Sequence, residues 1–152
     1  MKIVSAPALM SRSRTFFLLR SKPTYSQLGI LVLRLALGIS MAYHGYLKFM
    51  SGAAGLYKVG AMLAPLGVPG YFEVFGTVAA FSELLGGILV ALGLFTRLGS
   101  VLLAVVLFTA TILHWDAGFF SWDYPSQMGF AALAIFCIGG GRYSVDHSLF
   151  GK

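Results

Sequence analysis

Charged residues are scarce in this chain. Asp, Glu, Lys and Arg make up 11% of its 152 residues and hydrophobic residues 58%, whereas ordinary globular proteins carry about 25% charged residues. A soluble domain of this size needs a polar surface, which so few charged side chains cannot supply. The composition excludes a disordered chain and a nucleic-acid-binding domain, and it indicates an integral membrane protein surrounded by lipid.

Cysteine is almost absent. The single Cys137 lies in an apolar run. One thiol can form neither an internal disulfide nor a Cys-x-x-Cys pair. The sequence therefore excludes a disulfide-stabilised secreted domain and dithiol exchange within this chain.

Acidic residues are also few, with five Asp and Glu against eleven Lys and Arg. Eight of the basic residues lie in the N-terminal tail, at one short connection and at the C-terminus: Lys2, Arg12, Arg14, Arg20, Lys22, Arg97, Arg142 and Lys152. Clusters of this kind beside apolar segments are topology signals. They do not indicate a face that binds nucleic acid.

Long apolar runs are abundant. Crossing the hydrocarbon as a helix takes about 20 apolar residues. Four segments qualify, at about 28–47, 71–95, 98–115 and 124–141. We therefore expect an all-α membrane protein, a four-transmembrane-helix bundle over residues 28–148 that follows a basic N-terminal tail, 1–27.

The distribution of basic residues predicts the orientation of this bundle. Four spans place both termini on one side of the membrane, and that side carries eight Lys or Arg residues. The other side carries only Lys48 and Lys58. The positive-inside rule then predicts that both termini, and the tail 1–27, are cytoplasmic.

Two ionisable residues fall inside the expected spans, Arg34 in the first and Glu83 in the second. Charges at membrane depth need partners. In antiparallel helices we expect the depths of these two residues to differ by less than about 10 Å, so we predict that they pair. Such a pair is either structural, fixing helix register, or functional, as a proton-linked or ligand-binding carboxylate. We favour the structural interpretation, although both residues are candidate catalytic groups.

Further polar residues lie at the predicted outer ends of the helices: His44, Lys48, Glu73, His114 and Gln127. Three interpretations remain open. The residues form ordinary interfacial polarity, a binding site for a quinone or another small ligand, or a metal site built from His44, His114 and Glu73. No His-x-x-Glu or His-x-x-x-His spacing supports the metal interpretation, and we assign no metal.

Several short motifs resemble those of one family. They are LRLALG at 33–38, HG at 44–45, KF at 48–49, LGVP at 66–69, ELLGGIL at 83–89, LGLFTR at 92–97 and GGGRYSVD at 139–146. Taken in this order, they resemble the DoxX family of small bacterial membrane proteins over roughly residues 28–148. The resemblance carries over the recurrent positions Arg34, His44, Lys48, Glu83, Gly86, Gly87, Arg97 and Asp146.

The resemblance implies a multi-pass protein of the bacterial inner membrane. Some relatives are linked to thiosulfate:quinone oxidoreductases and others to complexes that handle oxidative or thiol stress. We therefore expect an accessory or quinone-interacting subunit of a membrane redox system and not a stand-alone enzyme. Glu83, Arg34 and His44 are its candidate catalytic residues, and Lys48, Glu73, His114 and Gln127 are its candidate ligand contacts.

The expected partners are the lipid bilayer and either a redox protein or further copies of the chain. No motif for haem, flavin or an iron–sulfur cluster is recognisable. A quinone is the candidate ligand. The alternative function is a non-catalytic membrane scaffold or assembly factor that packs against partner helices through small residues. A small-solute or proton carrier is less favoured, because no Pro interrupts the middle of a span.

Overall fold

The computed structural model describes residues 23–151, which form helices, turns and loops without a strand. Most of the predicted tail 1–27 lies outside this range. The elements are α2 (Pro23–Met50), α3 (Gly52–Ala61), the 3-10 turn η1 (Ala64–Leu66), α4 (Phe72–Leu92), α5 (Thr96–Leu113), the 3-10 turn η2 (Trp115–Ala117), α6 (Phe119–Ile138) and α7 (Val145–Phe150).

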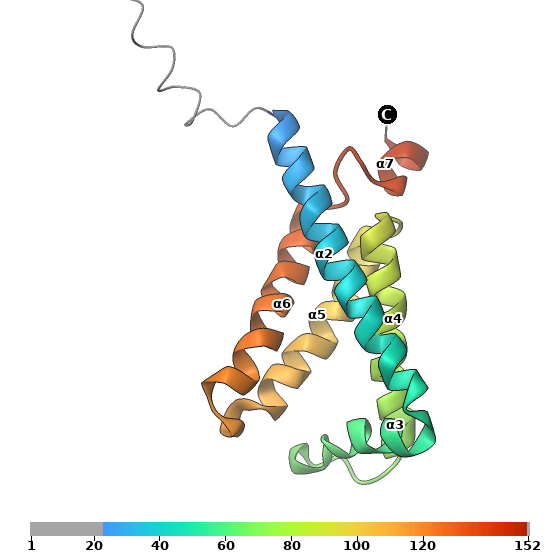
Figure 1. The fold of residues 1–152 in the computed structure, drawn as a ribbon, viewed down its shortest axis with the longest axis vertical. Helices are drawn as coiled ribbons and strands as arrows, with labels where there is room; N and C mark the ends of the chain where they lie inside the picture. The colour runs from blue at the N-terminus through green and yellow to red at the C-terminus, as the bar shows by residue number, and fades with distance from the viewer. Residues whose placement is uncertain (1–22, 152) are drawn as a thin grey trace, which may run out of the picture.

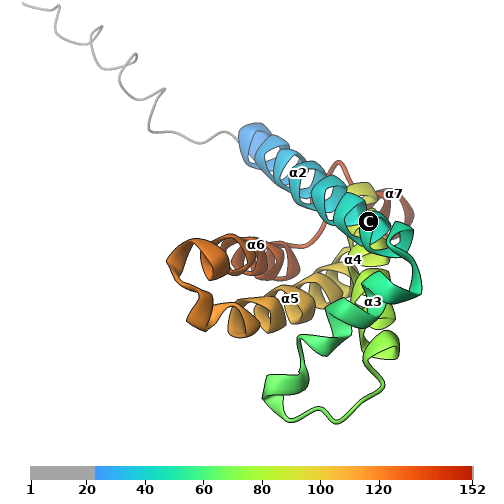
Figure 2. The same cartoon turned by 60° about the horizontal axis from the view of Figure 1, so that its bottom comes forward.

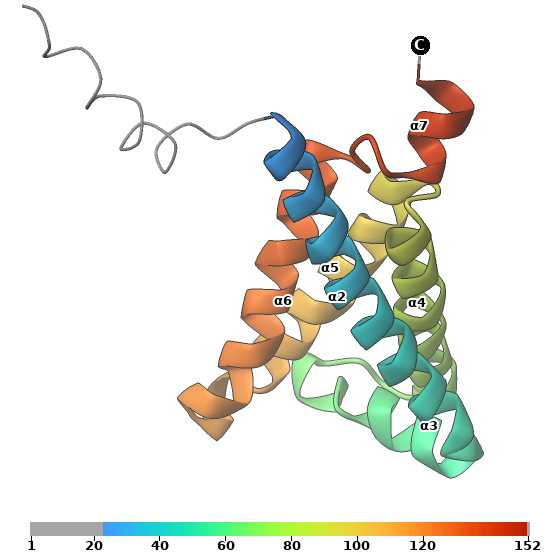
Figure 3. The same cartoon turned by 45° about the horizontal axis from the view of Figure 1, so that its top comes forward.

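The four long helices form two antiparallel pairs. α2 packs along α4, and α5 packs along α6 (Figures 1 and 2). α4 also packs against α5 and joins the two pairs. α3 lies across the end of the molecule opposite α7 (Figure 3). The start of α2 and the C-terminal segment thus share one end, and α3 and the α5–α6 connection lie at the other.

Glycines bring the backbones of α2 and α4 into close contact. A Cβ at Gly38 would lie 2.6 Å from Gly87 O, and one at Gly45 would lie 2.7 Å from Ala80 O. No side chain larger than hydrogen fits at these points. Small residues of this kind are the usual means by which helices approach closely in membranes.

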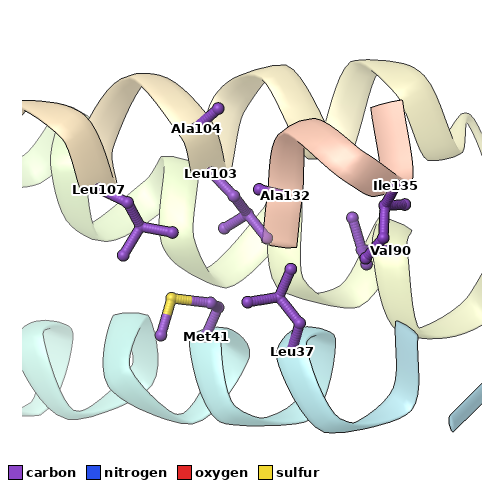
Figure 4. Packing of buried hydrophobic residues seen from close by; sticks show 8 residues of the cluster. All are labelled: Leu37, Met41, Val90, Leu103, Ala104, Leu107, Ala132 and Ile135. Atoms are coloured by element: carbon purple, nitrogen blue, oxygen red, sulfur yellow. The ribbon is translucent and has the colours of Figure 1, made fainter. Parts of the chain in front are cut away.

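The apolar core lies where α2, α4, α5 and α6 converge (Figure 4). Its buried members are Leu37, Met41, Val90, Leu103, Ala104, Leu107, Ala132 and Ile135. All four long helices thus contribute side chains to one cluster. Most other large apolar residues are exposed, as expected for a protein whose outer surface faces lipid.

Three helices, α2, α4 and α5, are long and apolar enough to cross a membrane. They correspond to the first three predicted spans. α6 is 20 residues long, but its first half carries Ser121, Asp123 and Gln127, so its apolar part is shorter. The fourth span therefore stays a prediction.

The helix bounds differ from the predicted ones by up to five residues, most of all at the starts of α2 and α6. α2 begins at Pro23, so residues 23–27, which we assigned to the tail, already belong to the first helix. α6 begins at Phe119, five residues before the predicted start. The segment between α5 and α6 is rich in aromatic residues whose rings pack together: Trp122 stacks on Trp115 at 4.8 Å and contacts Phe119 at 5.1 Å, between ring centroids.

Candidate functional site

Arg34 does not pair with Glu83, contrary to the prediction from sequence. Its side chain is 1% exposed and donates to backbone carbonyls at the end that holds the start of α2 and the C-terminal segment. Nε donates to Val90 O at 3.0 Å and Nη2 to Ala91 O at 3.0 Å, in the last turn of α4. Nη1 donates to Gly140 O and Tyr143 O in the loop after α6. Arg34 therefore satisfies carbonyl groups in the last turn of α4 and in the loop after α6.

The register of α2 and α4 explains this difference. The close contacts place Gly38 beside Gly87 and Ala91, and Gly45 beside Ala80 and Leu84. Glu83 is thus level with residue 45, eleven residues beyond Arg34. At a rise of 1.5 Å per residue the two charges are about 16 Å apart in depth. A sequence alone does not give the offset between two helices, and the expected 10 Å was too small.

Glu83 pairs instead with Lys48. Lys48 Nζ lies 2.5 Å from Glu83 Oε1. Glu83 is 5% exposed, and its second oxygen, Oε2, is buried without a hydrogen-bond partner among residues 23–151. A buried carboxylate oxygen without a donor is costly. The ion pair thus balances the charge of Glu83 but satisfies only half of its carboxylate.

A cavity of about 510 Å³ adjoins this ion pair. α4 and α5 form two of its walls, and α3 with the loop that follows it forms another. Most lining residues are apolar, including Val68, Val78 and Val106. The ionisable groups that line it, among residues 23–151, are Lys48, Glu83 and His114. The volume falls in the range of small-molecule sites, in which a few polar groups orient a mostly apolar ligand.

His114 lies at the C-terminal end of α5 and lines the same cavity. Its Nδ1 lies 2.8 Å from Ala110 O. A carbonyl only accepts, so Nδ1 carries the proton in this contact. In the neutral ring, Nε2 is then a free acceptor. The structure thus joins His114 and Lys48, two candidate ligand contacts, with Glu83, a candidate catalytic residue.

The other candidate residues lie elsewhere. His44 is exposed on α2, with its ring 6.3 Å from that of Tyr124. Glu73 is exposed in the first turn of α4. Gln127 is exposed and donates to the carboxylate of Asp123 at 2.9 Å. None of these residues lines the cavity.

The metal interpretation finds no support in the described part of the chain. It would have required His44, His114 and Glu73 to converge. Within residues 23–151, no group of three His, Cys, Asp or Glu side chains is placed to hold a metal ion.

Two features of the site were missed from the sequence. The first is the wall formed by α3 and its loop, with Val59, Met62 and Leu63, none of which was among the predicted ligand contacts. An apolar stretch beside a long connection was the available signal. The second is the Lys48–Glu83 pair itself. His44 and Lys48 are four residues apart in the sequence. That spacing did not indicate that Lys48 pairs with Glu83.

At the opposite end of the molecule, Asp146 caps α5. Its Oδ1 accepts from Phe95 N at 2.7 Å, and its Oδ2 accepts from Thr96 N at 2.9 Å and from Thr96 Oγ1 at 2.7 Å. Burial alone would raise the pKa of Asp146, but the hydrogen bonds from Thr96 and Phe95 and the charge of Arg34 hold that pKa below its usual value. Asp146 and Arg34 thus tie α7 and the preceding loop to the bundle.

Three membrane-length apolar helices, an apolar outer surface and buried charge define an integral membrane protein. Comparison with known families then gives its membership. The chain belongs to the DoxX family, whose model, described as DoxX, matches residues 29–115, more than half of the chain. Comparisons with curated proteins and with solved structures give no significant match.

Proposed function

We propose that this DoxX-family protein binds a quinone in the cavity beside Lys48 and Glu83, as an accessory subunit of a membrane redox system. The observation that carries the proposal is the unpartnered Oε2 of Glu83, a buried carboxylate oxygen in a residue that lines an apolar cavity. A ligand of the quinone–quinol couple fits this combination, because its body is apolar and the ring hydroxyls of its reduced form can donate to a carboxylate oxygen.

The location of the cavity supports a ligand that comes from the bilayer. The cavity lies between α4 and α5, two of the membrane-length helices. Phe75, Val78 and Val105 line it and are also exposed on the outer surface. A lipophilic molecule can therefore reach the ion pair from the lipid without crossing a charged surface. Quinones are lipophilic molecules whose ring oxygens are hydrogen-bonding groups.

The expected membrane arrangement belongs to the same proposal. α6 is a fourth span, both termini are cytoplasmic, and the protein resides in the bacterial inner membrane. The exposed Arg97 and Arg142 lie at the end that holds the termini, and Lys58 lies at the α3 end. This distribution follows the positive-inside rule. The cavity then faces the periplasmic half of the bilayer.

Any electron-carrying cofactor would belong to a redox partner in this proposal. The scaffold alternative relied on small-residue seams that pack against partner helices. The glycine seams of α2, α3, α4 and α5 are used within the chain, at contacts such as Gly38–Gly87, Gly60–Phe72 and Gly86–Gly99. We therefore favour the redox interpretation. The expected partner is a redox protein or a second copy of this chain.

A binding experiment tests the quinone site. The full chain, purified in mild detergent, is incubated with decylubiquinone and with decylubiquinol and examined by native mass spectrometry. We expect one adduct per chain. Ala79 lines the cavity one helical turn from Glu83, so the larger side chain of Ala79→Phe occupies space that the ligand needs. We expect the affinity to fall by roughly tenfold or more, which corresponds to about 1.4 kcal/mol.

Ala53→Phe is the matched control, because Ala53 is exposed on α3 and does not line the cavity. It should bind like the unsubstituted protein. Two results would contradict the proposal: no adduct with either form of the probe, or an Ala79→Phe variant that binds as tightly as the Ala53→Phe control.

A further inference from the structure

We infer that the cavity selects the reduced, hydroxyl-bearing form of its ligand over the oxidised, carbonyl-bearing form. This inference rests on the proposed function and adds the redox state that the site recognises. It follows from the kind of hydrogen-bonding group that the cavity offers, because a quinol has two O–H donors where a quinone has two acceptors.

Two of the groups that line the cavity can accept a hydrogen bond from a ligand, Glu83 and His114. Glu83 Oε2 has no donor, and its partner oxygen is already held by Lys48. The last torsion of a glutamate side chain is soft, so a small rotation turns Oε2 toward a ligand in the cavity. His114 uses Nδ1 on Ala110 O and, in the neutral ring, leaves Nε2 as a second acceptor.

The donors that line the cavity do not distinguish the two redox forms. Thr109 lines the cavity but donates its hydroxyl to Val105 O at 2.8 Å. The ammonium of Lys48 has three N–H groups; it lies 2.5 Å from Glu83 Oε1, and its remaining N–H groups can donate to an oxygen of either form. A carbonyl-only ligand would still leave Glu83 Oε2 unpartnered, whereas a hydroxyl group can donate to that oxygen.

The charge of the site favours a neutral ligand. Lys48 and Glu83 compensate each other at the wall of an apolar cavity. An anionic headgroup would add a charge with no counterion in a medium of low dielectric constant, which is unfavourable. Carboxylates and phosphates are thus disfavoured, and a neutral hydroxyl donor such as a quinol matches both the acceptors and the charge.

The test compares three probes of the same chain length on the full protein in detergent: decylubiquinol, decylubiquinone and the dimethyl ether of the quinol. The ether keeps the shape of the reduced ring but has no O–H. We expect the quinol to bind about tenfold more tightly than the other two, the typical effect of one hydrogen bond to a charged acceptor. This comparison needs no variant.

Glu83→Gln then assigns the preference to the carboxylate. A glutamine amide offers both a donor and an acceptor, so the quinol preference should fall to within about threefold, a difference of well under 1.4 kcal/mol. Glu73→Gln, at an exposed glutamate outside the cavity, should keep the full preference.

The outcomes separate this inference from the proposed function. If neither redox form binds, the proposed function fails and the inference fails with it. If both forms bind but the quinone or the ether equals the quinol, only the inference is overturned. A Glu83→Gln variant that folds and keeps the tenfold preference would also overturn it.

Discussion

Arg34 shows how one residue can join several segments of a membrane bundle. Its guanidinium has donors directed to carbonyls of α4 and of the loop after α6. The C-terminal end of a helix carries partial negative charge, so a cation is favourable there. The planar fork of arginine reaches separate acceptors at once, which a lysine ammonium on a single stem does not match. Its burial is therefore compensated without an acidic partner in the membrane.

Asp146 has the complementary role at the neighbouring helix start. α5 begins after Phe95, which has a φ of 44°. The phenyl side chain has no hydrogen-bonding group, so it cannot cap the helix. The carboxylate of Asp146, fifty residues away in sequence, accepts the N–H groups of Phe95 and Thr96. Carboxylates at helix N-termini satisfy free N–H groups and interact favourably with the helix dipole.

The lowered pKa of Asp146 predicts a pH-dependent stability. A carboxylate with a lowered pKa in the folded state stabilises that state above its unfolded pKa of about 3.9. This contribution is lost as the pH falls through the folded pKa. Asp146→Asn should lower the stability at pH 7 by about 1 kcal/mol, a typical cap contribution. Thermal unfolding in detergent between pH 3 and 7 measures both effects.

Asp116→Asn is the control, because Asp116 is exposed and its carboxylate accepts no hydrogen bond from the described residues 23–151. Its melting temperature should follow that of the unsubstituted protein at every pH. An Asp146→Asn variant with an unchanged melting temperature at pH 7 would show that the remote cap contributes nothing measurable.

Glu83 and Asp146 are both carboxylates, but their surroundings differ. Asp146 accepts three hydrogen bonds, whereas Glu83 has one ionic partner and a free buried oxygen. A purely structural carboxylate is expected to be fully satisfied. This contrast places Asp146 among the structural groups and Glu83 among the groups available to a ligand.

At the scale of the helices, glycine seams determine the register. The contacts of Gly38 and Gly45 with α4 allow only one offset between α2 and α4, because any Cβ would meet backbone atoms. The same offset brings Lys48 to Glu83. The seams therefore position the site, although no glycine lies in the ion pair.

A pair of alanine substitutions on α2 tests this role. A Cβ at Gly38 would lie 2.5 Å from Ala91 N, so Gly38→Ala must push the helices apart and should cost about 1–3 kcal/mol, as overpacking does. Gly29 lies on the same helix with nothing within 4 Å of a Cβ. Gly29→Ala should be neutral or stabilising by up to about 1 kcal/mol.

Thermal unfolding in one detergent, monitored by circular dichroism, compares the two variants directly. Equal melting temperatures for Gly38→Ala and Gly29→Ala would show that close packing of α2 and α4 does not limit stability. The Lys48–Glu83 contact would then need another explanation for its register.

At the scale of the whole molecule, the two ends have different roles. The end with the start of α2 and the C-terminal segment is closed by Arg34, Asp146 and α7 (Figures 1 and 3). The opposite end holds α3 and the cavity. One end is thus fixed by hydrogen bonds between distant segments, and the other contains the cavity for which we propose a ligand.

Cysteine accessibility tests the membrane arrangement. In a Cys137→Ser background, single cysteines replace the exposed residues Ala54, Ala117 and Ser148. If α6 crosses the membrane and the termini are cytoplasmic, a membrane-impermeant maleimide added outside should label positions 54 and 117, and position 148 only after lysis. Labelling of 117 and 148 from the same side would show that α6 does not cross.

The sequence alone was sufficient for the membrane class, the family and the positions of the long helices. Sparse charge and long apolar runs are local properties, and the insertion of a helix into lipid depends mainly on them. It could also be predicted that the side chains of Arg34 and Glu83 face the interior of the bundle, because glycines recur beside both residues at helical spacing. The apolar character of α6 was the weakest of these signals, because polar residues occupy its first half.

The tertiary structure decided which charges meet. The sequence predicted Arg34 with Glu83, and the structure instead joins Lys48 with Glu83 and directs Arg34 to carbonyls. The reason is that pairing depends on the offset between α2 and α4, and that offset arises from backbone contacts at Gly38 and Gly45. The cavity likewise exists only because α3 lies against α4 and α5, an arrangement that no local pattern along the chain specifies.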